Sequence, residues 1–310
     1  MLNRLHRLIP RKQSADFIGL CVTRNSICLV QAANTDQADP LSLKHSRQSD
    51  FKTLDQATEL LKGWVAELGL QGARVVLTLE QGDFELIQMD KPDVPETELQ
   101  AATHWKLQEY LEYPVTEAIS DIFEVPQGRH GHSNQLFAAV ARRQRLLTLT
   151  KLVRDAGLQP AVIDIAQLAM RNLAERRIES GDTLGLVHCH AHDSRLYICR
   201  GDTFYITRVI NLGLERLNTE DEMTQLQLVD QFALEVQRTM DYYDSHFGQS
   251  PVRQLHFLDR SGQIDWLPTA VTNLLGIQTA LVDMPAQVQP TAQIDLAPLA
   301  WGGLIGRLAP

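Results

Sequence analysis

Short apolar runs alternate with amphipathic stretches along the chain. In the first ninety residues, apolar runs of five or six residues predict strands at 17–22, 26–30, 74–79 and 84–89. The first two runs flank the polar triplet Thr23-Arg24-Asn25, which is typical of a tight turn. Residues 31–50 are polar and predict a loop or a weak strand. From 54 to 68 apolar residues recur every three or four positions, which predicts a helix.

The stretch from 96 to 173 has an order of elements of its own. It predicts a helix at 96–111, two strands around the turn-rich loop 127–134, a helix at 143–156, a short buried strand at 161–165 and a third helix. Pro92 and Pro95 precede the first helix, and its first turn is acidic, which suits the positive end of the helix dipole.

The second half repeats the opening pattern. Strands are predicted at 184–187, 196–199, 203–210, 255–258 and 278–282, and helices from about 218, at 267–275 and at 301–307. The long helix near 218 has an apolar seam at Leu226, Val229, Ala233, Val236, Met240 and Tyr243. Because each half opens with a strand–turn–strand unit, the pattern predicts a mixed α/β protein with two lobes.

Composition excludes several classes of protein. The chain has 310 residues, enough for two domains, and its formal net charge of -9 disfavours a nucleic-acid surface. No apolar run approaches the roughly 18 residues that span a bilayer. The cysteines show no disulfide spacing and lie in apolar runs, so we expect buried reduced thiols at Cys21, Cys28, Cys189 and Cys199.

The first twelve residues are basic. Arg4, Arg7, Arg11 and Lys12 carry charge without any acid, and leucines recur at about helical spacing. Two interpretations stay open: a solvated tail, or contact with an anionic membrane surface.

Four motifs carry a resemblance to a known family. They are ELQAATHWKLQEYLEYP at 98–114, LVRDAGLQPAVIDI at 152–165, LEVQRTMDYY at 234–243 and IDLAPLAWGGLIGR at 294–307. Together they resemble the PilM-like family of type IV pilus assembly, and most closely its MSHA-pilus branch. The resemblance implies an actin-like (ribonuclease H-like) two-lobed fold with an inserted α+β subdomain. The implied parts are a basic tail at 1–14, a first lobe at 15–181 with the insertion at about 74–163, and a second lobe at 182–310.

The resemblance also implies two loops that hold ATP and Mg²⁺ between the lobes. In the first loop, Cys21 stands where the family has an aspartate, and Thr23 where it has a glycine. A thiol is a poor ligand for Mg²⁺, which prefers hard oxygen. In the second loop His188 replaces an aspartate and His190 a glycine. A side chain at that glycine position would hinder close approach of the backbone to a phosphate.

The adenosine-binding stretch departs from the family too, because only one glycine, Gly262, follows the strand that ends at Leu258. We therefore expect a degenerate nucleotide cleft without catalytic residues or hydrolysis. Binding of ATP and Mg²⁺ without hydrolysis stays open. The residues assigned to this cleft are Thr23, Arg24, Asn25, Ser26, His190, Asp193 and Ser194.

Three histidines alternate with other residues at positions 188, 190 and 192. In an extended segment His188, His190 and His192 share one face, and imidazoles suit Zn²⁺ or Cu²⁺. Same-face neighbours on one strand lie about 6 to 7 Å apart, so all three reach one metal only if the strand bends. We assign no metal site, and the other interpretation is a polar turn that faces the cleft.

The resemblance implies an adaptor function. Family members are cytoplasmic, lie under the inner membrane, and bind the cytoplasmic N-terminal segment of a PilN-like membrane protein, MshJ in the MSHA system. That segment lies in a groove between the inserted subdomain and the lobe that carries it. Trp105 and Tyr110 are candidates for partner contact, with core packing as the alternative. The alternative functions are an ATPase whose nucleotide gates pilus assembly, a sugar-kinase-like enzyme and a filament-forming protein.

Overall fold

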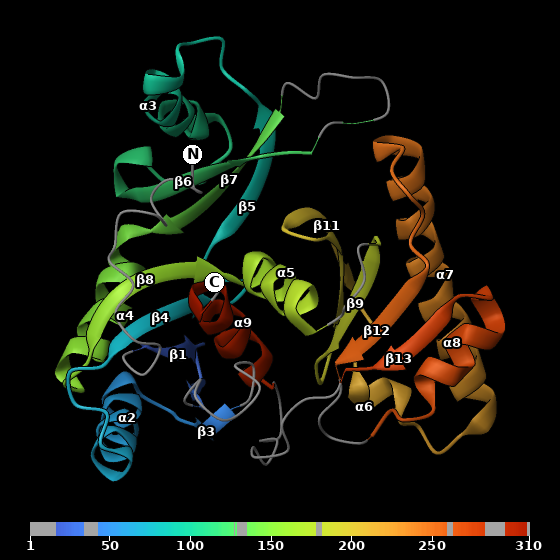
Figure 1. Ribbon diagram of the computed structural model, residues 1–310, viewed down its shortest axis with the longest axis horizontal. Helices are drawn as coiled ribbons and strands as arrows, with labels where there is room; N and C mark the ends of the chain where they lie inside the picture. Colours follow the sequence, from blue (N-terminus) through green and yellow to red (C-terminus); the bar gives the residue numbers. More distant parts are fainter. Residues whose placement is uncertain are drawn as a thin grey trace.

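The computed structural model describes residues 17–33, 43–126, 128, 135–177, 182–258, 263–282 and 295–308. Within these ranges the chain forms two five-stranded sheets and a three-stranded sheet, with helices around and between them (Figure 1). The basic tail at 1–14, the turn 127–134 except Gly128, and the stretch 259–262 after Leu258 lie outside the described residues.

The first sheet has the strand order β3-β2-β1-β4-β8. Strands β1 and β2 form an antiparallel hairpin, β3 extends it, and β4 and β8 add in parallel on the other side of β1. The strands are β1 (Phe17–Val22), β2 (Ser26–Ala32), β3 (Leu43–Asp50), β4 (Arg74–Leu79) and β8 (Gln159–Ile165). Four of these five strands match the predicted positions, and β3 forms in the stretch that the polar pattern left as a loop or weak strand.

The second sheet repeats this topology. Its order is β11-β10-β9-β12-β13, with an antiparallel hairpin, a third antiparallel strand and two parallel strands. Its strands are β9 (Leu184–Cys189), β10 (Ser194–Arg200), β11 (Thr203–Ile210), β12 (Gln254–Leu258) and β13 (Gln278–Leu281). The predicted duplication is therefore confirmed, and the chain has the two-lobed actin-like fold.

A separate unit is inserted between β4 and α4. It contains the antiparallel sheet β5-β7-β6, covered by a helix and two short 3₁₀ turns. Its elements are β5 (Glu85–Asp90), α3 (Glu96–Lys106), η2 (Leu107–Glu109), η3 (Val115–Glu117), β6 (Ala118–Glu124) and β7 (Gln135–Arg142). This unit is narrower than the expected insertion at 74–163, because β4 and β8 hydrogen-bond within the first sheet.

Helices cover the sheets and fill the space between the lobes. They are α2 (Leu54–Leu68), α4 (Arg143–Asp155), α5 (Ala166–Arg177), α6 (Leu214–Leu217), α7 (Glu222–Phe247), α8 (Leu267–Leu275) and α9 (Ala297–Leu308). Helix α9, although it is last in the sequence, packs on β1, β2 and β4 of the first sheet, whereas α5 packs on β10 and β11 of the second (Figure 1). The last helix of the expected second lobe at 182–310 therefore packs on the sheet of the first lobe.

Helices α5 and α9 pack against each other at the centre of the molecule. A Cβ on Gly302 of α9 would lie 2.1 Å from the Ala169 carbonyl oxygen of α5, so only glycine permits this approach. The Asn172 amide donates a hydrogen bond of 3.1 Å to the Gly302 carbonyl oxygen. The glycine-rich C-terminal motif thus has a packing function.

The long helix α7 begins later than the pattern predicts. Asp221 caps its N-terminus by accepting a hydrogen bond from the Thr224 amide, so the helix starts at Glu222. Its buried seam runs from Leu228 to Phe247, and Leu226 is 61% exposed. The inclusion of Leu226 in the seam was therefore wrong: its side chain points away from the sheet that α7 covers.

Candidate functional site

The first expected nucleotide loop is the turn between β1 and β2. The Thr23 amide donates to the Ser26 carbonyl oxygen at 2.9 Å, and the Ser26 amide donates to the Thr23 hydroxyl at 3.0 Å. The buried Ser26 hydroxyl donates to the Asp50 carboxylate of β3. Arg24 and Asn25, at the tip, are exposed. The turn therefore satisfies its own amides and hydroxyls and presents only its tip to solvent.

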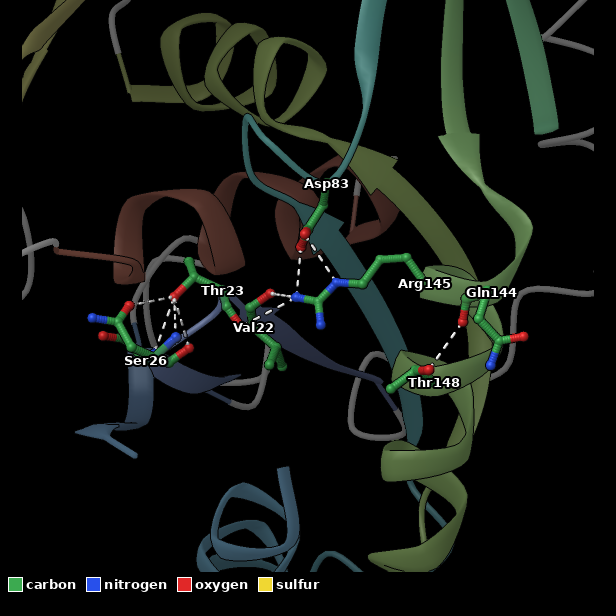
Figure 2. A network of polar contacts seen from close by, with 8 residues as sticks. Val22, Thr23, Ser26, Asp83, Gln144, Arg145 and Thr148 are labelled. Carbon is green, nitrogen blue, oxygen red and sulfur yellow. Dashed lines mark hydrogen bonds and ion pairs between the residues drawn. The ribbon is translucent and has the colours of Figure 1, made fainter. Parts of the chain in front are cut away.

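Arg145, near the start of α4, contacts this β1–β2 turn through its guanidinium group (Figure 2). Its guanidinium forms a two-pronged ion pair with Asp83, with Nε–Oδ1 and Nη2–Oδ2 distances of 2.9 Å. The same Nη2 donates to the carbonyl oxygens of Thr23 at 3.1 Å and Val22 at 3.4 Å (Figure 2). The end of β1, the stretch after β4 and the start of α4 are thus joined by one side chain.

The second expected nucleotide loop is the turn between β9 and β10, and the start of α6 hydrogen-bonds to it. The His190 amide donates to the Asp193 carbonyl oxygen at 2.8 Å, and the Leu214 amide donates to the His190 carbonyl oxygen at 2.8 Å. The buried Ser194 hydroxyl donates to the Leu212 carbonyl oxygen at 2.7 Å. The His190 amide and the Ser194 hydroxyl of this turn are therefore bound within the protein.

Gly213 fits closely under this second turn. A Cβ at Gly213 would lie 2.4 Å from the Ala191 carbonyl oxygen and 2.5 Å from the Asp193 nitrogen. Real side chains essentially never approach so closely, so the turn and the start of α6 require glycine here.

The three histidines do not converge. His188 and His190 are buried, with ring centroids 4.2 Å apart, whereas the His192 side chain is exposed and its Nδ1 lies 3.2 Å from a Glu215 carboxylate oxygen. The reason is that β9 ends at Cys189 and the chain turns, which breaks the alternation. The part of the chain that the structure describes contains no cluster of three His, Cys, Asp or Glu side chains suited to a metal.

Burial lowers the pKa of His190 well below its ordinary value, and the nearby His188 and Arg195 lower it further. Neither ring nitrogen of His190 has a hydrogen-bond partner among the described residues. The ring is therefore a neutral, buried group beside the second turn.

A buried ion pair joins the two lobes near the turns. Glu80 directly follows β4, and Arg195 lies in β10; their side chains are only 10% and 9% exposed and are in direct contact. Burial raises the pKa of Glu80, and the positive charge of Arg195 opposes that effect. Arg195 Nε also lies 3.7 Å from the Asp193 carboxylate. The charges between the lobes are therefore matched by the protein's own side chains.

These groups do not fit a Mg²⁺–ATP site. The thiol of Cys21 is fully buried in the sheet, and burial followed by the charge of Glu80 raises its pKa well above the ordinary value. Carboxylate oxygens are the ligands that Mg²⁺ prefers. Each nearby carboxylate has a partner in the protein: Asp50 with Ser26, Asp83 with Arg145 and Glu80 with Arg195.

A groove separates the inserted subdomain from the lobe that carries it. We call this pocket of about 370 Å³ the Tyr113 groove; it is lined by Arg24, Gly82, Asp83, Phe84, Glu85, Glu112, Tyr113, Val140, Arg142 and Arg145. The Arg142 guanidinium lies 3.8 Å from the centroid of the Tyr113 ring. The groove thus combines an aromatic face, three arginines and three acids.

Of the seven expected cleft residues, only Arg24 lines this groove. Trp105 and Tyr110 are 64% and 45% exposed, so the core-packing alternative was wrong for both. Neither lines the Tyr113 groove, and both lie on or just after α3. The structure therefore presents them as free surface of the inserted subdomain.

The sequence pattern missed the charged residues that hold the site together. Glu80 and Arg195 are 115 positions apart, and Asp83 and Arg145 are 62 apart. No local spacing signals such pairs. The only hint was that Glu80 and Asp83 follow a buried strand, at the edge where sites collect in α/β sheets.

No protein-family model matches the sequence, and no curated protein matches it either. Solved structures are similar in fold. The structure of the PilM–PilN type IV pilus biogenesis complex aligns with a TM-score of 0.69 at 19% identity, covering 95% of this chain and 99% of that chain. The cytoplasmic domain of EpsL, an inner-membrane component of the type II secretion system of Vibrio cholerae, aligns with a TM-score of 0.52 at 11% identity, covering 94% of each chain.

Proposed function

We propose that this chain is a cytoplasmic adaptor of type IV pilus assembly that docks the N-terminal segment of a PilN-like inner-membrane protein. The observation that carries the proposal is the similarity in fold to the PilM–PilN complex structure, which extends over 95% of this chain and includes the inserted subdomain. The family motifs favour the MSHA system, with MshI as the counterpart of this chain and MshJ as its partner.

The Tyr113 groove is the proposed docking place. It lies between the inserted subdomain and the carrying lobe, where the family resemblance implies a bound peptide. An aromatic ring beside an arginine provides a surface for an apolar anchor, and the charged rim offers partners of both signs. Trp105 and Tyr110 are further candidates because large exposed aromatic residues are common at interfaces.

We propose an adaptor without ATP hydrolysis. The supporting geometry is that Arg145 and Arg195 are paired with Asp83 and Glu80, and that both turns use their polar groups internally. A Mg²⁺–ATP complex that used these charged groups would have to break the pairs, which is unfavourable because it leaves charges without partners. Isothermal titration calorimetry with Mg-ATP tests this part, and submicromolar binding would contradict it.

The adaptor reaches the membrane through its partner. None of the helices in the described residues is long and apolar enough to cross a membrane. We propose a peripheral position at the inner membrane, held by the partner's segment. The basic stretch 1–12 adds a second proposed contact, with anionic lipid.

The experiment is a pull-down with the cytoplasmic N-terminal peptide of the PilN-like protein encoded by the same organism. The immobilised peptide should retain the full chain both with and without ATP. A peptide of the same composition in scrambled order is the control. Failure to retain the chain under either condition would remove the basis of the adaptor proposal.

A further inference from the structure

Two sheet edges lie on opposite sides of a second groove. β5 is an outer strand of the three-stranded sheet, and β11 is an outer strand of the second five-stranded sheet. Both line a groove of about 650 Å³, which we call the interlobe groove, together with Phe84, Phe137, Gln167 and Phe247. Figure 1 shows β5 and β11 on the two sides of the space between the inserted sheet and the second lobe.

β5 is an open and regular edge. It pairs only with β7, from Glu85 opposite Val140 to Asp90 opposite Gln135, without a register shift. Apart from the terminal Asp90 carbonyl oxygen, which accepts from Lys106, its backbone makes no hydrogen bond outside its own sheet within the described residues. Edge strands usually carry a bulge, a proline or another block, and β5 has neither a bulge nor a proline.

β11 is a less suitable template. Its pairing with β10 shifts between Ile198 and Cys199, which marks a bulge next to Phe204. A bulge twists an edge and interrupts a regular ladder. β11 therefore forms a wall of the groove, and β5 is the edge able to accept another strand.

The lining of the groove indicates the chemistry of its occupant. Phe137 and Phe204 are in contact, with ring centroids 5.8 Å apart, and are buried behind the lining. The accessible apolar surface comes from Leu86 and Ile87, which are half-buried, and from the exposed Tyr242. Gln167 of α5 is only 4% exposed, and its Oε1 has no hydrogen-bond partner among the described residues. Buried polar atoms are normally satisfied, so this acceptor indicates that a donor belongs in the groove.

The charge in the interlobe groove further limits which segment can bind there. Glu85 is the one Asp, Glu, Lys, Arg or His side chain that lines the interlobe groove among the described residues. It is exposed and makes no hydrogen bond or ion pair in the part of the chain that the structure describes. A segment that is apolar in its middle and basic at one end complements this surface.

We infer that the interlobe groove receives an extended segment of a partner protein, which adds to β5 as a fourth strand of the inserted sheet. The six residues of β5 span about 20 Å, so the segment has about five to seven residues. Its alternate apolar side chains contact Leu86, Ile87 and Tyr242, a hydrogen-bond donor meets Gln167, and a Lys or Arg lies beside Glu85. This site differs from the docking place in the Tyr113 groove, although the two grooves share Gly82, Phe84 and Glu85.

The test uses the full chain and the synthetic peptide acetyl-Lys-Val-Thr-Val-Thr-Val-Thr-amide at millimolar concentration. The peptide should slow amide hydrogen exchange in 85–90 at least tenfold. A second peptide with N-methyl groups on all three valines, and a third with them on all three threonines, separate strand pairing from apolar contact. Because alternate amides of a strand point to opposite sides, at least one methylated peptide should lose the effect.

Two variants complete the test. Gln167→Leu should weaken peptide binding by about five- to tenfold, the effect of one lost hydrogen bond. Ile119→Lys on β6, the opposite edge of the same sheet, should leave binding unchanged. The inference is overturned if 85–90 gains no protection, or if both methylated peptides protect as well as the parent. It is also overturned if 85–90 becomes protected as the protein alone is concentrated, since the occupant would then be a second copy.

Failure of this test leaves the adaptor proposal intact, because the pull-down uses the PilN-like peptide and not the strand peptide. An Arg142→Glu variant distinguishes binding in the Tyr113 groove from binding in the interlobe groove. Arg142 lines the Tyr113 groove and not the interlobe groove. This change should therefore weaken binding of the PilN-like peptide and leave binding of the strand peptide unchanged.

Discussion

Glu80 of the first lobe and Arg195 of the second form a buried ion pair that joins the two halves of the molecule. The pair lies between the two turns where the family resemblance places nucleotide phosphates. Arg195 is therefore a cation beside the second turn whose anionic partner is a carboxylate of the protein itself.

Removing one partner of this pair should destabilise the fold. Arg195→Ala leaves the Glu80 carboxylate buried without its cation, and the expected loss in the free energy of unfolding is about 3–5 kcal/mol. Urea denaturation measures it. Lys62→Ala, which breaks the exposed pair with Glu59, is the control and should cost less than about 1 kcal/mol. A loss within about 0.5 kcal/mol of zero for Arg195→Ala would show that the pair does not join the lobes.

Gly213 should not tolerate even a methyl group. Gly213→Ala places a Cβ against the Ala191 carbonyl oxygen, and the displaced turn should cost about 1–3 kcal/mol. Gly63→Ala is the matched control, because Gly63 lies inside helix α2 with open space around its Cβ position. That control should gain about 0.5–1 kcal/mol by helix propensity. Equal melting temperatures for the two variants would contradict the close packing of α6 under the turn.

His190 should make stability depend on pH. Its folded-state pKa is lowered by burial, so as pH falls below about 6.5 the unfolded chain takes up a proton that the folded chain refuses. The stability contribution is complete above that pH and is lost on acidification, by up to about 1.4 kcal/mol per pH unit. His190→Phe should make this slope shallower between pH 6.5 and 5, measured by urea denaturation at each pH. His192→Phe, at the exposed position, should leave it in place, and identical slopes in all three proteins would contradict the burial of His190.

Trp105 should matter for binding and not for stability. Because its side chain is 64% exposed, Trp105→Ala should change the free energy of unfolding by less than about 0.5 kcal/mol. If α3 contributes to partner contact, the same change should weaken binding of the PilN-like peptide about tenfold. Fluorescence anisotropy with labelled peptide measures this, and unchanged affinity for both Trp105→Ala and Tyr110→Ala would remove α3 from the docking surface.

The sequence pattern was sufficient for most of the elements and for the duplication. Helices α2 and α8 have the predicted bounds, since each carries a regular apolar face that ends at a glycine, Gly69 or Gly276, in a left-handed conformation. The pattern failed where tertiary context decides. Leu226 continues the apolar spacing of α7 but lies on its exposed side, and spacing alone does not tell where the covered sheet ends.

The candidate site was predictable only in part. The residues Cys21, Thr23, His188 and His190 led us to expect altered nucleotide loops, and that expectation stays a prediction. The ion pairs that match the charges there were not predictable, because Glu80–Arg195 and Asp83–Arg145 connect residues from separate strands and helices. The packing of α9 on the first sheet involves close contacts of Gly303 with Thr78 of β4 and of Ala300 with Gly19 of β1, which a single sequence does not reveal.

The most direct measurement is a calorimetric titration of the full chain with the N-terminal cytoplasmic peptide of the proposed PilN-like partner. Arg142→Glu, which alters the Tyr113 groove, is compared with Arg154→Glu, the same charge change on an exposed face of α4 outside both grooves. We predict binding to the wild type and to Arg154→Glu, unaffected by Mg-ATP, and binding at least tenfold weaker to Arg142→Glu. No binding to the wild type, or binding that appears only with Mg-ATP, would contradict the account.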